Sequence, residues 1–413
     1  MTESRTAFQP ASTAPATQLP TGTQGNYNIS IGYLRAFVTL LVLAHHALLA
    51  YCPFAPPPPT SLLLQPRWWQ AFPVVDTARW SGFSLFVGFN DTFFMSLMFF
   101  LSGLFVWNSL QRKGSGAFLR DRFLRLGLPF VFVAAFVAPL AYYPTFLQTG
   151  ATTGFPGFSQ QWLSLGNWPA GPAWFVWVLL AFDCVAVLFT LLLPKWGDSV
   201  GRLTASASRR PAVFFALLVA LSAVAYIPME LAFNPLQWTA FGPFTFQTSR
   251  VLHYLVYFLI AGGVGAYGIN RGLLAPDGKL ARRWPLWVIS TLFAFVLGTI
   301  VVIIASTTHL GSRSWETAGD IAFSLSCAAS CLAFLSLFVR FARSRVKLLD
   351  SLRDNAYGMF LVHYAFVSWL QYALLPAALP AITKGCLVFL GTVALSWGTV
   401  ALLRRVPAIA KVV

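Results

Sequence analysis

Charge is scarce in this sequence, and acidic side chains are its scarcest part. Only 10% of the 413 residues are Asp, Glu, Lys or Arg, whereas soluble domains carry roughly 25%. Hydrophobic residues make up 57% of the chain, and the mean hydropathy is +0.68. A soluble globular protein is excluded on these grounds, and an integral membrane protein is predicted.

Cysteine is also rare, with five residues in the chain. Only Cys52 lies near the side expected to face outward, so no disulfide framework is predicted. Cys327 and Cys331 are four residues apart on one helix face, which a soft metal could use, but free cysteine is more often a small buried hydrophobic residue. We expect no metal site and no permanently bound cofactor.

Long apolar runs occur about ten times. A helix rising ~1.5 Å per residue needs ~20 residues to cross ~30 Å of hydrocarbon. The strict two-residue alternation of a lipid-facing barrel strand is absent, so the runs predict an all-α, polytopic membrane bundle of about ten transmembrane helices. The expected spans are 33–52, 87–108, 124–143, 172–193, 211–229, 251–268, 285–306, 317–339, 357–375 and 384–403.

The formal net charge of +16 raises nucleic acid as a possible partner. Most of the 28 Lys and Arg residues, however, fall in alternate connecting segments, on the side that also receives both termini. The positive-inside rule makes that side cytoplasmic. The basic residues therefore indicate topology in a lipid bilayer, and nucleic acid is not expected as a partner.

One membrane domain, residues 27–405, is expected to account for almost the whole chain. Residues 1–26 are rich in Thr, Ala, Pro, Gln and Ser and lack the pattern of a signal peptide, so they predict a disordered cytoplasmic tail. Residues 406–413 are expected to form a second cytoplasmic tail. The Pro-rich patch 53–59 opens an outer segment that we expect to be structured.

The first apolar run carries an arginine at one end and two histidines at the other. Arg35 and His46 are eleven positions apart, so at ~100° per residue they share one helix face, ~16 Å apart along the axis. His45 points ~100° away from that face. An ionisable side chain in a membrane helix usually faces the bundle interior or a wet cavity, which favours a functional role. Snorkelling of Arg35 or an interhelical hydrogen bond of His46 would be the structural alternatives.

Arg122 and Arg125 follow the second apolar run, in the segment LRDRFLRLGLP. Side chains at i and i+3 are neighbours on a helix, so two guanidinium groups could bind one phosphate. Cytoplasmic loops are basic in any case, and the pair also fits a purely topological signal.

Further motifs are spread along the chain: FFLSGLF with Ser102, GPAWFVWVLL with Trp174, and NAYGMFLVH with Tyr357 and His363. Together with Arg35, His46 and the arginine pair, their order and spacing resemble the membrane-bound acyltransferase-3 family over residues 31 to about 403. That family includes glucan succinyltransferases and O-antigen acetyltransferases. Ala356 and Phe360 depart from its usual Ser and Tyr, which leaves Tyr357 as the remaining phenol.

The resemblance implies transfer of an acetyl or succinyl group from cytoplasmic acyl-CoA to a hydroxyl of a saccharide or related acceptor. Arg35, Arg122 and Arg125 would anchor the CoA phosphates, and its pantetheine arm would run along the first helix to His46. There His46 would act as the general base, which we favour, or as a nucleophile. The bacterial inner membrane is the expected location.

A histidine base usually has an orienting partner on its other ring nitrogen. Among the acids, Asp183 ranks first because a mid-membrane carboxylate is expensive to keep without a use. Asp91, Glu316 and Asp320 are the other candidates.

Contacts to the substrate are expected from Ser102, Trp174, Arg250, His253, Tyr357 and His363, with Arg250 and His253 placed to meet the acceptor. Arg250 and His253 could instead anchor the outer interface, and His363 could simply pack. The outer tryptophans, Trp68, Trp69, Trp80, Trp168 and Trp174, could stack on a sugar, although an interfacial aromatic belt accounts for most of them.

A secondary transporter or flippase is the alternative function, because buried polar groups in a helical bundle suit it equally well. Transporters often show paired halves with helices broken at Gly or Pro. Such halves are not evident in this sequence.

Overall fold

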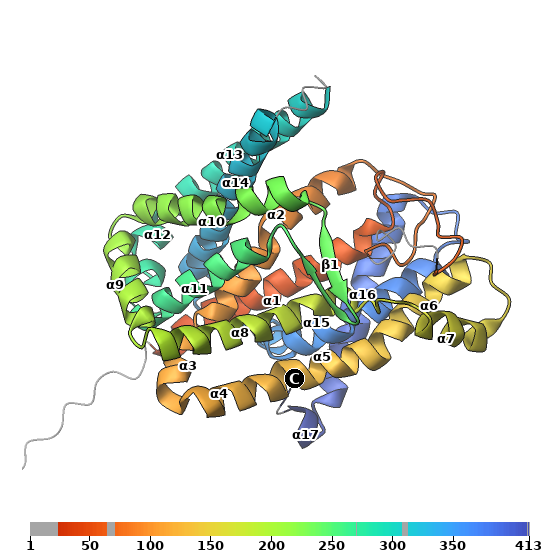
Figure 1. The fold of residues 1–413 in the computed structure, drawn as a ribbon, viewed down its shortest axis with the longest axis horizontal. Helices are drawn as coiled ribbons and strands as arrows, with labels where there is room; N and C mark the ends of the chain where they lie inside the picture. Colours follow the sequence, from red (N-terminus) through yellow and green to blue (C-terminus); the bar gives the residue numbers. More distant parts are fainter. Residues whose placement is uncertain (1–23, 64–70, 270, 308–312, 411, 413) are drawn as a thin grey trace, which may run out of the picture.

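The computed structural model describes residues 24–63, 71–269, 271–307, 313–410 and 412 (Figure 1). In chain order the elements are α1 (Gln24–Leu49), α2 (Gly82–Gly103), α3 (Val106–Lys113), α4 (Ser115–Arg122), η2 (Phe123–Gly127), α5 (Leu128–Phe132), η3 (Val133–Val137), α6 (Ala138–Gln148), α7 (Gly154–Leu163), η4 (Gly171–Ala173), α8 (Trp174–Leu192), α9 (Trp196–Ser208), α10 (Pro211–Phe233), β1 (Trp238–Phe241), β2 (Phe244–Gln247), α11 (Val251–Tyr267), η5 (Gly272–Leu274), α12 (Lys279–Arg282), α13 (Trp284–Thr307), α14 (Arg313–Phe341), α15 (Lys347–Ala373), α16 (Ala381–Leu403) and α17 (Pro407–Ala410). Segments η2 and η3 are π-helical, and η4 and η5 are 3₁₀ turns.

The predicted all-α, polytopic membrane bundle is confirmed. Among the described residues, eight helical stretches are long and apolar enough to span a bilayer, and α11 with the segment Gly272–Arg282 would make a ninth across an 83° bend. Ten were expected. The tenth predicted span, 357–375, lies largely in α15. That helix is 27 residues long, but polar residues such as His363 and Gln371 make it less apolar.

The predicted tails are only partly within the described residues. Helix α1 begins at Gln24, inside the segment 1–26 predicted as a tail. Residues 1–23 lie outside the described part of the chain. At the other end, α17 covers Pro407–Ala410 within the segment 406–413.

Helix α1 lies inside the bundle, in contact with α2, α14, α15 and α16 (Figure 1). Leu34, Val38 and Val42 recur every four residues and are at most 1% exposed, which is the spacing of one helix face. Leu43 and Ala47 are fully buried on a neighbouring face. Polar side chains on α1 are therefore directed towards other helices.

A two-stranded hairpin connects α10 to α11. Helix α10 ends before Asn234, which has a φ of 60° and a ψ of 159°, and Pro235 then prevents continuation of the helix. Strands β1 and β2 pair antiparallel, with Trp238 opposite Gln247 and Phe241 opposite Phe244. Gly242 begins the two-residue turn with a φ of 56°, the conformation for which hairpin turns select glycine.

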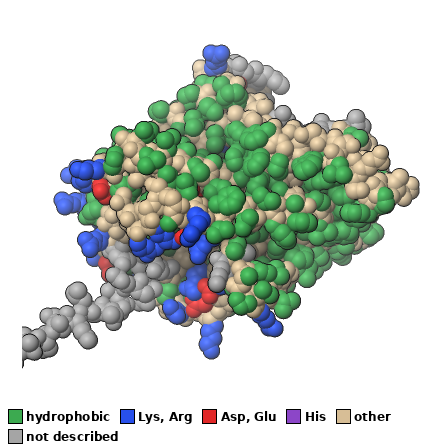
Figure 2. All heavy atoms as spheres, turned by 60° about the horizontal axis from the view of Figure 1, so that its bottom comes forward, with side chains coloured by type: hydrophobic (Ala, Val, Ile, Leu, Met, Phe, Trp, Pro, Cys, Tyr) green, Lys and Arg blue, Asp and Glu red, His purple; other side chains and the backbone are tan. Residues whose placement is uncertain are grey.

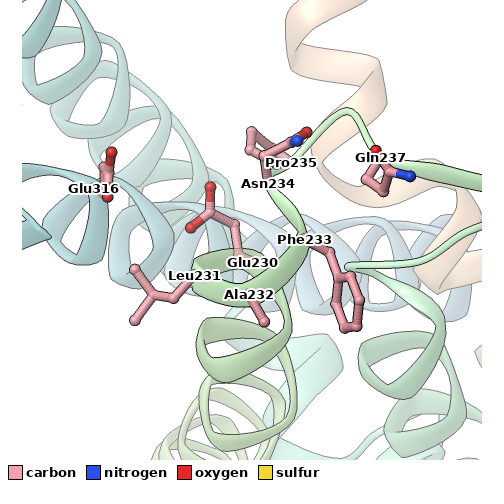
Figure 3. A pocket seen from close by; sticks show the side chains of 8 residues that line it. All are labelled: Glu230, Leu231, Ala232, Phe233, Asn234, Pro235, Gln237 and Glu316. Atoms are coloured by element: carbon pink, nitrogen blue, oxygen red, sulfur yellow. The ribbon is translucent and has the colours of Figure 1, made fainter.

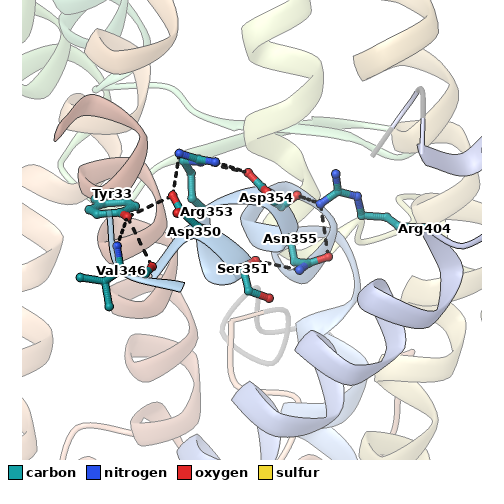
Figure 4. A network of polar contacts seen from close by, with 8 residues as sticks. All are labelled: Tyr33, Val346, Asp350, Ser351, Arg353, Asp354, Asn355 and Arg404. Atoms are coloured by element: carbon teal, nitrogen blue, oxygen red, sulfur yellow. Dashed lines mark hydrogen bonds and ion pairs between the residues drawn. The ribbon is translucent and has the colours of Figure 1, made fainter. Parts of the chain in front are cut away.

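A polar network ties α15 to both α1 and α16 (Figure 4). The Tyr33 phenol on α1 donates to Asp350 Oδ1 at 3.0 Å. Arg353 forms ion pairs with Asp350 and Asp354, each at 2.9 Å. Arg404, which directly follows α16, donates to the Asp354 carbonyl oxygen. These contacts fix α15, which carries His363, relative to α1, which carries His46.

The Lys and Arg side chains gather at one end of the bundle. In Figure 2 they lie mainly on the left and lower side, the end where Figure 1 shows α3, α9 and α12, while hydrophobic side chains dominate the right. The cytoplasmic placement of both termini rests on this asymmetry and stays a prediction.

Polar contacts anchor the segment between α1 and α2. Arg79 donates to the carbonyl oxygens of Cys52 and Ala55 at 2.6 and 3.0 Å. The Asp76 carboxylate forms an ion pair with Lys384 Nζ on α16 at 2.7 Å, and both side chains are at most 3% exposed. All five cysteines are free, and burial raises the pKa of the Cys52 thiol to about 12.

Replacing Lys384 with Met is expected to destabilise the fold by about 3 kcal/mol, because Asp76 would be left buried without its counter-charge. The double variant Asp76→Asn with Lys384→Met should recover part of the loss, since no net charge stays buried. Thermal unfolding of the purified variants measures both effects. Equal melting temperatures for wild type and Lys384→Met would show that the pair adds no net stability.

Candidate active site

A cavity of about 370 Å³ lies at the C-terminal end of α1. Residues from α1, α2, α8, the hairpin, α11 and α15 line it, chiefly His45, His46, Asp91, Trp174, Trp238, Gln247, Tyr254 and Tyr364. Its wall thus combines imidazole, carboxylate, amide and phenol groups with aromatic planes. This is the composition of a site that binds and orients a small polar ligand.

His46 stands in the cavity wall with one ring nitrogen already engaged. Its Nδ1 lies 2.9 Å from the Val42 carbonyl oxygen and 3.3 Å from Nε2 of His363 on α15. In turn, Nδ1 of His363 lies 2.7 Å from the Phe360 carbonyl oxygen. Because carbonyl oxygens only accept hydrogen bonds, Nδ1 carries the proton in both neutral rings.

This assignment leaves Nε2 unprotonated in both rings. Nε2 of His363 accepts the hydrogen bond from His46, and Nε2 of His46 keeps its lone pair in the cavity wall. His363 is fully buried, and Gln371 donates to the carbonyl oxygens of His46 and Ala47, which ties α15 to the end of α1. The pair has the arrangement of a general base with an orienting partner.

Asp183 is not that partner, which corrects the prediction. Its buried carboxylate lies 3.3 Å from Nε of Arg122, an ion pair without hydrogen-bond geometry. Trp174, in the cavity wall, begins α8, and Asp183 follows nine residues later. At ~1.5 Å per residue it lies ~14 Å away along the helix. The sequence places Asp183 in mid-membrane but cannot give its depth relative to His46.

Arg35 and Arg122 form a cationic cluster with Asp183. The charges of the two arginines are close enough to repel each other. Each guanidinium lies over an aromatic ring, Arg35 over Phe105 at 5.8 Å and Arg122 over Phe118 at 5.0 Å, within cation–π range. With two positive charges and one negative, and with the Arg122 side chain 24% exposed, the cluster suits an anionic group such as a phosphate.

Arg125 does not lie beside Arg122 in this cluster. Arg122 ends α4, and Arg125 lies in the π-helical turn η2, whose wider turn separates i and i+3 side chains. Arg122 faces Asp183, whereas the side chain of Arg125 is exposed. The Tyr357 phenol donates to the Arg125 carbonyl oxygen at 2.6 Å, so Tyr357 positions the turn.

The other predicted substrate contacts divide between the cavity and the interior. Arg250 reaches the cavity through Asp91, with Nη1 2.8 Å from Oδ2 of a carboxylate that is 45% exposed. His253 is fully buried with Nε2 3.5 Å from Cys327 Sγ, away from the residues that line the cavity. Ser102 donates to the Met98 carbonyl oxygen on its own helix and is likewise not a lining residue.

Glu316 belongs to a different cavity. This second cavity, of about 420 Å³, lies where α10 leads into the hairpin, and Glu230 and Glu316 line it together with Asn234 and Gln237 (Figure 3). His46 is not part of its wall. Glu316 is therefore not placed to orient His46.

Of the predicted outer tryptophans, Trp174 lines the cavity and forms an edge-to-face pair with Trp238, their ring centroids 5.4 Å apart. Trp80 and Trp168 are exposed, at 43% and 38%, and do not line it. Trp68 and Trp69 lie outside the described residues. Among the described residues, the tryptophans of the cavity wall therefore come from α8 and the hairpin.

Several cavity residues were not predicted as site residues. His45 points ~100° from the face of His46, and the cavity extends around the end of α1 to include both rings. Tyr364 directly follows His363, so its position beside the motif is a sequence signal for it. Tertiary packing brings Trp238, Gln247 and Tyr254 to the cavity. Local sequence patterns do not predict such packing.

These features define a polytopic helical membrane protein in which a hydrogen-bonded pair of histidines adjoins a mainly apolar cavity that carries a few polar groups. Residues 28–401 match the acyltransferase-3 family, described as an acyltransferase domain, and the chain belongs to that family. The protein is thus a membrane acyltransferase. Comparison with curated proteins and with solved structures gives no match.

Proposed function

We propose that the protein transfers an acetyl or succinyl group from cytoplasmic acyl-CoA to a hydroxyl of a saccharide or related acceptor on the opposite side of the bacterial inner membrane. The observation that carries this proposal is the His46–His363 pair, which leaves the Nε2 lone pair of His46 in the cavity wall. A membrane acyltransferase needs such a base beside the acceptor hydroxyl.

The donor would bind with its phosphates at Arg35 and Arg122. These residues lie on the same side of the bundle as the N-terminal end of α1, and Arg35 is ~16 Å from His46 along that helix. The pantetheine arm would follow α1, so that the thioester meets the acceptor at the cavity. Arg125, exposed in η2, would contact the phosphates from the outside of the cluster.

In the reaction, the acceptor hydroxyl gives its proton to Nε2 of His46 while its oxygen attacks the thioester carbon. The new C–O bond forms and the C–S bond breaks. The proton then passes from His46 to the thiolate, which leaves as CoA thiol. Throughout, Nδ1–H of His46 stays hydrogen-bonded to Val42 and His363, which stabilises the positive charge on the ring.

The acceptor would occupy the cavity beside Trp174 and Trp238. Aromatic faces with nearby amide and carboxylate groups, here Gln247 and Asp91, suit a polyhydroxyl ring. The ion pair with Arg250 holds the Asp91 carboxylate in place. Arg250 would thus support acceptor binding without touching the acceptor itself.

The reaction class is tested by release of free CoA thiol from purified protein given acetyl-CoA or succinyl-CoA, with and without a mixed glucan acceptor. We expect release that depends on the acceptor. No release with either donor, from protein shown to be folded, would overturn the proposal and favour a transporter.

A matched pair of His363 variants tests the role of the orienting ring. His363→Phe removes one of the two acceptors for Nδ1–H of His46 and leaves the Val42 carbonyl oxygen, and it is expected to lower kcat on the order of 10²-fold. His363→Gln places an amide oxygen near the former Nε2 and should retain more activity. Steady-state kinetics at several pH values compares them. Equal kcat for His363→Phe and wild type would remove His363 from the mechanism.

A further inference from the structure

His45 occupies the same cavity wall as His46, but its hydrogen bonding is different. Its ring stacks on Phe94 at 5.1 Å and lies edge-to-face with His46 at 5.5 Å. The residue is 8% exposed and lines the cavity. His45 is therefore held by packing on one side and faces the ligand space on another.

Asn90 on α2 determines which nitrogen of His45 carries the proton. The amide Nδ2 of Asn90 lies 3.2 Å from the Leu41 carbonyl oxygen and 3.5 Å from Nδ1 of His45. An atom facing a carbonyl oxygen must be a donor, so the amide nitrogen, and not its oxygen, stands at this position. The flipped amide would set its oxygen against that of Leu41.

It follows that Nδ1 of His45 is the unprotonated nitrogen, because Nδ2 of Asn90 can only donate to it. In the neutral ring the proton then resides on Nε2. His46 has the opposite arrangement, with the proton on Nδ1 and a lone pair on Nε2. Two consecutive histidines in one cavity wall thus offer an N–H donor and a lone pair.

We propose that His45 is a second catalytic residue, whose Nε2–H donates a hydrogen bond to the thioester carbonyl oxygen as that oxygen becomes negatively charged. This inference rests on the proposed function. His46 takes the proton of the hydroxyl as the C–O bond forms, and His45 keeps its own proton while it stabilises the oxyanion. The oxyanion collapses as the C–S bond breaks, and the proton from His46 goes to the departing sulfur.

The adjacency of the two residues has a geometric reason under this proposal. Consecutive helical side chains leave the axis ~100° apart, but the ring centroids of His45 and His46 are only 5.5 Å apart, so both rings can reach one reacting carbon from different directions. The hydroxyl and the carbonyl oxygen of a tetrahedral intermediate also diverge by a similar angle. Preorganised donors aimed at the developing charge supply a large share of the rate enhancement in acyl transfer.

Two variants of matched size separate the donor from the packing. His45→Leu removes the N–H, and kcat is expected to fall by about 10²- to 10³-fold with little change in KM. His45→Gln offers an amide N–H near the former Nε2 and should retain considerably more activity. Both are compared with wild type for melting temperature, kcat and KM.

A donor analogue gives a readout that packing alone would not change. A CoA dithioester carries sulfur in place of the carbonyl oxygen and accepts hydrogen bonds poorly. Wild type and His45→Gln should prefer the ordinary thioester, whereas His45→Leu should lose much of that preference. Unchanged kcat and preference in His45→Leu, or equal losses in both variants, would overturn the assignment. Absence of transfer by wild type would instead contradict the proposed function.

Discussion

His46→Ala is expected to abolish acyl transfer, with a fall in kcat of about 10³- to 10⁴-fold, because the variant loses the Nε2 lone pair that accepts the hydroxyl proton. The fold should persist. Ala favours helix, and the bond from Gln371 reaches the backbone carbonyl of residue 46, which the substitution keeps. Acceptor-dependent thiol release and a thermal melt measure the two properties.

His253→Gln is the matched control, because His253 lies on a membrane helix but does not line the cavity. Its kcat should stay close to that of wild type. Transfer retained in a folded His46→Ala protein would remove His46 from the mechanism. Mass spectrometry of protein incubated with donor alone distinguishes the two roles of His46, because only a nucleophile would carry a covalent acyl group.

Arg122→Leu is expected to impair both folding and donor binding. Asp183 is fully buried, and loss of its counter-charge should destabilise the protein by about 3 kcal/mol or more. A charge-assisted hydrogen bond to a phosphate contributes about 1.5–3 kcal/mol. The dissociation constant for acyl-CoA should therefore rise about 10- to 100-fold.

The double variant Arg122→Leu with Asp183→Asn separates these effects. Removing the buried carboxylate should restore much of the melting temperature, whereas weak acyl-CoA binding should persist. Titration of a fluorescent acyl-CoA into the detergent-solubilised protein measures affinity. Wild-type affinity in the folded double variant would leave Arg122 as a structural and topological residue only.

The bundle could be predicted because membrane helices are encoded locally. Each span needs only a run of apolar residues, and most of the apolar runs in this sequence form long helices. Local patterns were less informative where polar residues are concentrated. Helix α15 carries the polar residues His363 and Gln371 within its apolar stretch. Helix α11 is only 17 residues long and is followed by a bend. The hairpin was not anticipated, since its strands are four residues each.

The site was predictable along helices and not between them. Helical periodicity predicts that Arg35 and His46 share one face of α1, and the resemblance of the segment NAYGMFLVH to a family motif singles out His363. Which residues meet across the bundle depends on depth and rotation, which a single sequence does not supply. For this reason the sequence favours Asp183 as the partner of His46 although Asp183 pairs with Arg122, and does not predict that His363 contacts His46.

Acyl transfer through the bundle is tested most directly in sealed proteoliposomes, with radiolabelled acyl-CoA enclosed and a glucan acceptor outside. We predict label on the external acceptor, its loss in His46→Ala vesicles, and no labelling when donor and acceptor share the outer compartment. Label that never reaches the acceptor, in vesicles shown to hold folded protein, would contradict an acyltransferase that joins a cytoplasmic donor to an acceptor across the membrane.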